Sequence, residues 1–289
     1  MGNTVVKSAL HNLSMPPKDI PEDNGCVFGG KTLPPEVLEN ILKYVPTKDL
    51  CKSASRVCKH WNFLLSHRRF WFEKLVVEGI SLPESLRTRL LNETDNVETL
   101  QILKILTSGY LPLNKNLIKN PSGEENLKYW EVIHGGDGVI VEETPAGSDP
   151  IPEEAGLPTQ HCFVTSYRKG RRLQVIDLIS LGFTPSIMDI LKPRIEISEW
   201  VSARWDCRSK SELIVVLVGR KTEKRVSLNW SSDDDDVLQR LWYQLKEVVI
   251  DYPKGLHTIE YVSIGNDSQF WAGHYGAKSA GSSVKLILA

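Results

Sequence analysis

Cysteine is scarce in this 289-residue sequence: five residues are scattered along the chain, and no two form a Cys-x-x-Cys pair. An odd, scattered set is typical of reduced thiols, and it disfavours a disulfide framework and a structural zinc site. Long hydrophobic runs are missing as well. Leu213–Val218, among the longest, is far too short to cross a membrane, and residues 1–30 hold no apolar stretch typical of a secretory signal. We therefore expect a soluble, cytoplasmic protein without a transmembrane segment.

An excess of either charge is also missing. Lys and Arg total 35 against 36 Asp and Glu, for a net charge of −1, which is too balanced for a nucleic-acid-binding protein. The glycines of Gly135–Gly138 lack nucleotide-loop spacing, and Asp233–Asp236 lacks the alternation of a calcium loop. We expect no cofactor, no metal and no catalytic residue. A glycosidase pair of carboxylates, which forms only in space, stays an open alternative.

The beginning of the chain shows no apolar periodicity. Residues 1–30 mix Pro, Gly, Asn and charged residues, so we expect a flexible arm. Gly2 opens a stretch similar to an N-myristoylation start, but Val6 stands where Ser or Thr is favoured. Lipidation and an unmodified tail are both compatible with this sequence.

Apolar residues recur with helical spacing from Thr32 onward. Proline follows where a first helical turn tolerates it, and Pro46 ends that helix. We expect Thr47 to cap the next helix and Phe70–Phe72 to open another, which ends near Gly79. The apolar stripe consists of Val37, Leu38, Ile41, Leu42, Val45, Leu50, Ala54, Val57 and Trp61.

Two signatures lie in residues 31–79: Leu33–Glu36 ahead of the stripe, and Arg56–Lys59 followed by Trp61. In order and identity they resemble an F-box, which implies a few short helices that dock on the Skp1 adaptor of cullin–RING ubiquitin ligases. A module this small buries little apolar area alone, and an exposed apolar helix face fits a partner helix. By this resemblance the adaptor-binding residues are Leu33, Pro34, Leu38, Ile41, Pro46, Leu50, Val57 and Trp61.

Residues 80–123 continue with helical spacing of leucines and end in the turn cluster Asn120–Gly123. We expect a helical linker here, because a helix holds two modules apart better than a Gly/Ser tether does.

Residues 124–289 predict a mainly antiparallel β-sandwich, so the fold class is α+β multidomain. One helical insertion is expected at Thr184–Leu191. His161–Tyr167 and Leu173–Leu178 flank a polar turn and predict a hairpin. The other expected strands are 129–133, 139–141, 194–198, 213–218, 226–230, 242–250, 258–264 and 283–288.

Three stretches of this second part are specific: Tyr129-Trp130, Gln174–Leu178 and Phe270–Ala277. They resemble the F-box-associated domain of the sugar-recognising F-box proteins. The resemblance implies a jelly-roll-like, galactose-binding-like sandwich whose end loops hold the chitobiose core of N-glycans.

By the same resemblance the glycan-binding residues are Tyr167, Phe270 and Trp271, whose rings suit stacking on sugars. Ala272 stands where the family has a lysine, so this chain lacks that set of hydrogen-bond donors. Burial in the sandwich core is the alternative for Phe270 and Trp271.

The two resemblances together predict a substrate-recognition subunit of an SCF (Skp1–cullin–F-box) ubiquitin ligase, itself without catalysis. Its partners are the Skp1 adaptor, through it a cullin–RING ligase, and misfolded glycoproteins retrotranslocated from the endoplasmic reticulum. A receptor for a protein surface, a ligase-independent glycan-binding module and a glycoside-processing enzyme are the alternatives.

Overall fold

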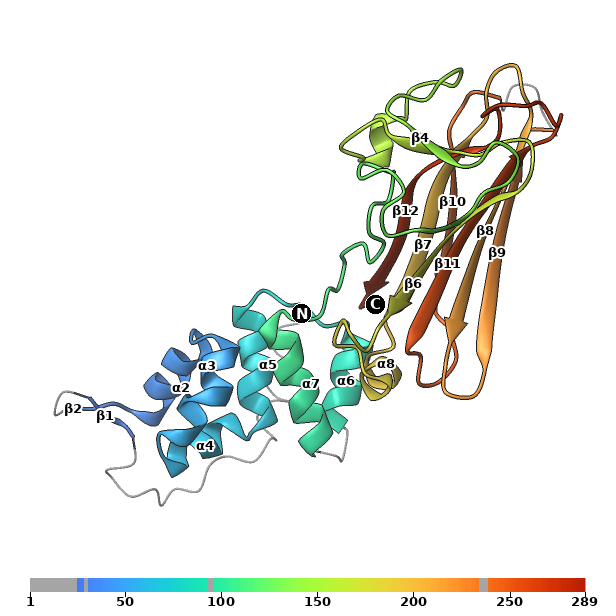
Figure 1. Cartoon of the computed structure of the whole chain (residues 1–289). Helices are drawn as coiled ribbons and strands as arrows, with labels where there is room; N and C mark the ends of the chain where they lie inside the picture. Colours follow the sequence, from blue (N-terminus) through green and yellow to red (C-terminus); the bar gives the residue numbers. More distant parts are fainter. Residues whose placement is uncertain (1–24, 29–30, 93–95, 234–238, 289) are drawn as a thin grey trace. The chain divides into compact units, whose positions relative to one another are not determined.

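The computed structural model describes residues 25–28, 31–92, 96–233 and 239–288 (Figure 1). The chain divides between Leu111 and Pro112 into two compact units, the first helical and the second built of strands. The predicted α+β multidomain fold class is therefore confirmed. The proposed myristoylation at Gly2 and most of the predicted arm lie outside the described residues.

The first unit contains one strand pair and a series of short helices. Pro35 is the first residue of its leading helix, as the sequence predicts. Thr47 begins the next helix instead of capping it, because its hydroxyl donates to the Thr107 carbonyl oxygen at 3.1 Å. The described elements are β1 (Val27–Phe28), β2 (Lys31–Thr32), α2 (Pro35–Lys43), α3 (Thr47–Lys52), η1 (Ala54–Arg56), α4 (Lys59–Leu65), α5 (Arg68–Val77), α6 (Glu84–Asn92) and α7 (Asn96–Ser108).

Helix α5 lies at the centre of this unit and contacts α2, α4 and α7. Trp71 is fully buried on it, and so is Lys74, whose ammonium group donates to the Lys43 and Val45 carbonyl oxygens at 2.9 and 2.8 Å. These bonds satisfy carbonyl groups that the end of α2 leaves without helical partners. Because α7 packs on α3 and α5, the helices predicted as a linker belong to the same unit as residues 31–79.

The second unit begins earlier than the sequence indicates. The Asn114 and Leu117 amides donate to the Leu286 and Val284 carbonyl oxygens, both at 2.9 Å. Among the described residues, β5 pairs with β12 only at Lys278 and Ser279, so beyond these residues the extended chain takes the place of a strand on that side of β12. Residues 112–123, predicted as the end of the helical linker, are therefore part of the sandwich unit.

The second unit is a sandwich of two five-stranded antiparallel sheets, ordered β10-β7-β12-β5-β4 and β3-β6-β11-β8-β9. Every predicted strand region contains a strand, and the predicted helix is present. The elements are β3 (Glu131–Ile133), β4 (Ile140–Glu142), η2 (Glu153–Ala155), β5 (Cys162–Val164), β6 (Gly170–Asp177), α8 (Pro185–Leu191), β7 (Arg194–Ser202), β8 (Ser209–Val218), β9 (Glu223–Ser231), β10 (Tyr243–Val249), β11 (Thr258–Asp267) and β12 (Lys278–Ile287).

The predicted hairpin of β5 and β6 is wrong. β5 pairs with β4 and β12 in one sheet, whereas β6 pairs with β3 and β11 in the other. The polar segment between them crosses from one sheet to the other. Turn residues indicate that the chain reverses, but they do not determine which strand pairs with which.

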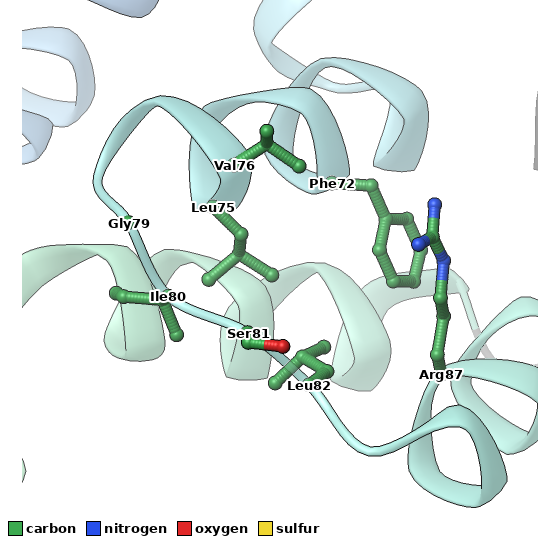
Figure 2. Close-up of a pocket in the computed structure, with 8 residues that line it drawn as sticks. All are labelled: Phe72, Leu75, Val76, Gly79, Ile80, Ser81, Leu82 and Arg87. Atoms are coloured by element: carbon green, nitrogen blue, oxygen red, sulfur yellow. The ribbon is translucent and has the colours of Figure 1, made fainter. Parts of the chain in front are cut away.

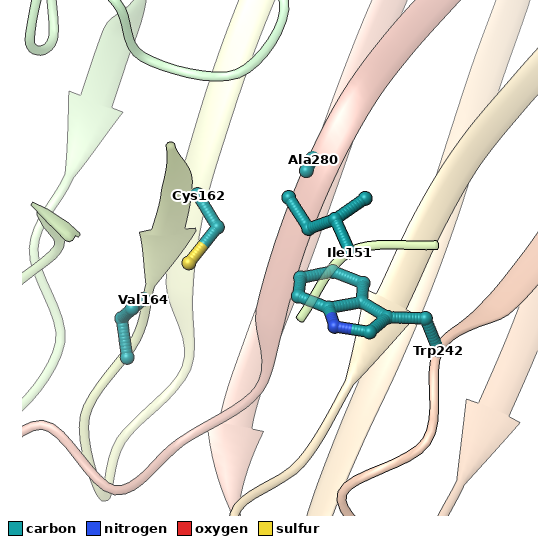
Figure 3. Close-up of a cluster of buried hydrophobic side chains, with 5 residues drawn as sticks. All are labelled: Ile151, Cys162, Val164, Trp242 and Ala280. Carbon is teal, nitrogen blue, oxygen red and sulfur yellow. The ribbon is translucent and has the colours of Figure 1, made fainter. Parts of the chain in front are cut away.

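A cluster of buried hydrophobic side chains lies on the outer face of the sheet that contains β12. Ile151 packs there with Cys162, Val164, Trp242 and Ala280, as Figure 3 shows. The Trp242 indole nitrogen also donates to the Asp149 carbonyl oxygen at 2.7 Å. The long connection from β4 to β5 is thereby fixed to the sheet.

An ion pair joins the two sheets in the sandwich interior. Arg172 of β6 donates to Glu199 of β7 at 3.0 Å, and the two residues are 2% and 1% exposed. The guanidinium carbon lies 3.6 Å from the centroid of the Phe163 ring. Burial lowers the pKa of Arg172, and the charge of Glu199 opposes that shift.

Candidate adaptor face and ligand site

The predicted adaptor-binding residues separate into interior and surface positions. Leu38 and Leu50 are 1% and 0% exposed, so they hold the helical unit together and present no surface. Ile41 and Val57 are 49% and 57% exposed, which is large for apolar side chains. Of the others, Pro34 and Pro46 are exposed, whereas Leu33 and Trp61 are half-buried.

Helix α2 and its C-cap residue, Tyr44, carry further exposed apolar side chains. Val37 and Tyr44 are 41% and 77% exposed, and with Ile41 they stand four and three residues apart, which places them on one helix side. We call these three residues the α2 surface. Val37 and Tyr44 are both absent from the predicted adaptor-binding set, although their spacing from Ile41 was a usable signal.

Residues 25–28, predicted as the end of a flexible arm, instead pack on Trp61. The Trp61 indole donates to the Gly25 carbonyl oxygen at 2.8 Å, and the Phe28 ring stacks 6.3 Å from it. A Cβ atom on Gly25 would lie 2.5 Å from the Cys58 sulfur and 2.7 Å from the indole nitrogen. The close approach requires glycine, and it leaves Trp61 only partly accessible.

The helical unit also holds a shallow groove of about 220 Å³ beyond the end of α5. Figure 2 shows Phe72, Leu75, Ile80 and Leu82 on its walls, with the Arg87 side chain beside the Phe72 ring. None of the eight predicted adaptor-binding residues lines it. The groove reflects the packing of α5 against the segment that leads to α6.

At one end of the sandwich, loops carry the predicted glycan-binding residues. Tyr167, between β5 and β6, is half-buried. Phe270 and Trp271, between β11 and β12, are 71% and 46% exposed. The alternative that these two are core aromatics is therefore wrong, and their rings are accessible to a ligand.

A buried carboxylate holds Phe270 outward. Asp267 is fully buried at the end of β11, and its Oδ1 accepts hydrogen bonds from the Gln269 and Phe270 amides. Phe270 has φ of +59°, a left-handed conformation that is uncommon for an aromatic residue. The two hydrogen bonds maintain this conformation.

Two further loops hold the other end of the aromatic segment. The Ser166 hydroxyl donates to the Gly273 carbonyl oxygen at 2.7 Å and accepts from the Asp137 amide at 3.0 Å. The Asp137 carboxylate accepts from the Gly273 amide, and His274 Nε2 lies 3.2 Å from the Asp137 carbonyl oxygen. We call the three joined segments, residues 135–138, 165–168 and 267–276, the loop rim. Sequence reasoning identified residues 135–138 only as a turn.

The loop rim continues into the turn after β7, which sequence reasoning missed. The Arg204 guanidinium carbon lies 4.8 Å from the centroid of the Tyr275 ring, and that ring meets Trp271 edge-on at 6.2 Å. Trp205, next in the chain, is 63% exposed. In the sequence, the available signal for this turn was a tryptophan that lies between an arginine and an aspartate and outside any strand-like alternation of apolar and polar residues.

Ala272 is exposed beside these aromatics and supplies no side-chain donor. Within the described ranges, no group of three or more His, Cys, Asp or Glu side chains is arranged to hold a metal ion. No helix in the same part of the chain is long and apolar enough to span a membrane.

Two protein-family models match the chain. Residues 31–75 match the F-box-like model, and residues 110–286 match the F-box associated region. The curated relatives include F-box only protein 27 of Mus musculus, which is 34% identical over 87% of this chain and 89% of its own length. F-box only protein 17 of Homo sapiens is 31% identical, with 88% and 91% covered.

Similar solved structures include carbohydrate-binding modules. The family 16 carbohydrate-binding module 2 has a TM-score of 0.37 at 15% identity, covering 58% of this chain and 99% of its own. TmCBM61, solved with β-1,4-galactotriose, has a TM-score of 0.36 at 12% identity, covering 61% of this chain and 100% of its own.

Proposed function

This chain belongs to the F-box proteins that carry an F-box associated region, and we propose that it is the substrate-recognition subunit of a Skp1–cullin–F-box ubiquitin ligase. In this proposal the helical unit binds the Skp1 adaptor. The loop rim binds the chitobiose core of N-glycans on misfolded glycoproteins retrotranslocated from the endoplasmic reticulum. The protein acts in the cytoplasm and directs these substrates to ubiquitination and proteasomal degradation.

The exposed apolar side chains of the helical unit support adaptor binding. The α2 surface, Val57 and Phe28 are each at least 41% exposed, although Leu38, Leu50 and Trp71 already provide an interior for the helices. Such exposure costs solvation free energy, which a partner helix recovers by covering the apolar area. Leu38 and Leu50 contribute indirectly, because they position α2 and α3.

One observation carries the ligand half of the proposal: Phe270 and Trp271 are exposed on a segment that Asp267 and Asp137 hold at both ends. Exposed aromatic rings bind sugars through the C–H faces of the pyranose ring. Because hydrogen bonds already hold the segment, little conformational entropy is lost on binding. A rigid, exposed aromatic site at loop ends therefore fits a small polar ligand with flat apolar faces.

A receptor for a non-glycan protein surface is the second candidate. Ala272 favours it, because the family lysine and its donors for sugar oxygens are missing from this chain. A glycan-binding module that works without the ligase is the third. Whether the ligase substrate is a glycan or a protein surface, the chain needs no catalytic activity of its own. It acts by raising the concentration of the substrate near the ubiquitin-loading partner.

Pull-down with purified Skp1 tests the adaptor half. Changing Ile41→Asp together with Val57→Asp should weaken adaptor binding at least about tenfold, since both side chains are exposed where the partner would lie. Val76→Asp is the matched control, because Val76 is 70% exposed on α5 and lies outside the predicted set. A wild-type chain that does not bind Skp1 would contradict the ligase assignment.

Isothermal titration calorimetry with a chitobiose-containing glycan tests the ligand half. Trp271→Ala should abolish binding without unfolding the sandwich, since Trp271 is 46% exposed and supports no core. Ile250→Ala is the control, because Ile250 is 77% exposed just after the strand end opposite the loop rim. Glycan binding without Skp1 binding would favour the ligase-independent module, and the reverse result would favour a protein receptor.

A further inference from the structure

The Trp205 side chain is highly exposed on the turn between β7 and β8. Its side chain is 63% exposed, more than that of Trp271, and it lies between β7 and β8 at the loop-rim end of the sandwich. An exposed indole of this size leaves a large apolar area in water. Because the neighbouring loops already present aromatic rings, the Trp205 side chain is a candidate for ligand contact.

The backbone beneath Trp205 is held firmly. The Arg204 guanidinium donates twice to the Asp206 carboxylate, at 2.9 and 3.1 Å, across the base of the turn. The Trp205 amide donates to the Gly147 carbonyl oxygen at 2.9 Å, and Cys207 is fully buried. The indole is thus presented from a fixed turn, so binding to it would not require the backbone to be ordered.

The same turn is connected to the loop rim through packed side chains. Arg204 lies over the Tyr275 ring at 4.8 Å, and Tyr275 meets Trp271 edge-on at an interplanar angle of 84°. Arg204 therefore fixes Tyr275 on one side and, through Asp206, the Trp205 turn on the other. The turn that carries Trp205 is thus joined to Trp271 by the side chains of Arg204 and Tyr275.

We propose that Trp205 is a second sugar-stacking platform, which binds a saccharide unit beyond the chitobiose that occupies Phe270 and Trp271. This inference rests on the proposed glycan-binding function and extends it to ligand length: the preferred ligand is a neutral oligosaccharide longer than a disaccharide. The additional contact offsets part of the affinity lost with the lysine that Ala272 replaces.

The charges around Trp205 favour a neutral sugar over a charged one. The hydrogen bonds from Arg204 lower the pKa of Asp206, so the carboxylate stays ionised and its charge balances that of the guanidinium. Within the turn, the charges of Arg204 and Asp206 are paired with each other, and the indole of Trp205 is the most exposed of the three side chains. The flat apolar face of the indole, beside an ion pair without net charge, suits the C–H face of a pyranose ring.

Calorimetry of the full chain with two glycans tests this inference. The probes are free chitobiose and the pentasaccharide core of N-glycans, which adds three mannose units to it. Trp205→Ala should weaken binding of the pentasaccharide by about tenfold and leave chitobiose binding unchanged within about twofold. Trp205→Phe should restore most of the loss, whereas Trp271→Ala should abolish binding of both ligands.

Each outcome bears on a different claim. If the wild type binds both glycans and Trp205→Ala changes neither affinity, or changes both equally, the second platform is refuted while the proposed function stands. If a glycoprotein is affected but the free pentasaccharide is not, Trp205 contacts polypeptide and the inference is also refuted. If the wild type binds neither glycan, the proposed function fails, and this inference fails with it. Circular dichroism of each variant confirms that the fold is retained.

Discussion

Replacing Arg172 with methionine should destabilise the sandwich unit by about 3–5 kcal/mol. The substitution keeps an unbranched side chain of similar length against Phe163 but removes the cation. In the wild type the Arg172 guanidinium lies 3.0 Å from the carboxylate of Glu199, which is 1% exposed. In the variant this carboxylate stays in the interior without that partner. An unpaired buried charge costs far more than the lost contact itself.

The expected magnitude follows from the network around the pair. Arg172 also donates to the Ser263 and Ser279 hydroxyls at 3.0 and 2.7 Å, and Glu199 accepts from Ser263 and Ser282 at 2.8 Å each. Changing Arg172→Met with Glu199→Met removes both charges but leaves these hydroxyls without charged partners, at about 1 kcal/mol for each lost bond. Compared with Arg172→Met, the double variant removes the unpaired charge but loses two further bonds, those from Ser263 and Ser282 to Glu199, so it should be about 1–3 kcal/mol more stable.

Urea unfolding of the two variants and of Glu199→Met completes a double-mutant cycle. Tryptophan fluorescence mainly follows the sandwich unit, which holds six of the eight tryptophans, and the Trp130 ring centroid lies 4.6 Å from the Arg172 guanidinium carbon. Far-ultraviolet circular dichroism near 222 nm, dominated by helices, follows the first unit as an internal control. A loss below about 1 kcal/mol in Arg172→Met, or a double variant no more stable than the single ones, would refute the reasoning.

Three other outcomes are expected. Asp267→Ala should weaken glycan binding at least about tenfold in calorimetry, and Asp267→Asn should retain more, because an amide oxygen still accepts the bonds that hold Phe270. Ala272→Lys combined with Phe270→Tyr should strengthen glycan binding by about 1.5–3 kcal/mol, and unchanged affinity would show that these positions do not contact sugar. Burial raises the pKa of the Cys162 thiol to about 12, so iodoacetamide at pH 8 should modify the exposed Cys51 and spare Cys162 in mass spectra of the native protein.

Local signals in the sequence were sufficient for the elements and for the family. Helical spacing up to residue 106 and the strand-like segments after residue 123 correspond to the two units, because the periods of helix and strand are properties of a few neighbouring residues. The helix predicted at Thr184–Leu191 is present as α8, and its start has a hydroxyl cap before a proline, both of which are local features. The resemblance to F-box proteins rested on residue identities in order, and the family models match the same regions.

Errors arose where the outcome depended on distant residues. The pairing of β5 and β6 depends on β12 and β11, which lie about a hundred residues further along the chain. Residues 112–123 belong to the sandwich because the end of β12 accepts their hydrogen bonds. The periodicity of a segment carries no information about such distant partners. Neither the pairing of β5 and β6 nor the placement of residues 112–123 could therefore be predicted from the segment itself.

The sequence alone determined the two modules, their strands and helices, and the aromatic identities at the candidate ligand site, because these depend on local period and residue type. The tertiary structure alone decided which of those residues are accessible. Leu38 and Ile41 belong to one stripe, yet helix packing buries the first and exposes the second. Asp267 turns Phe270 outward, and Arg204 and Tyr275 join the turn that carries Trp205 to Trp271. Exposure and proximity result from long-range packing and hydrogen bonds, which exist only once the strands have found their neighbours.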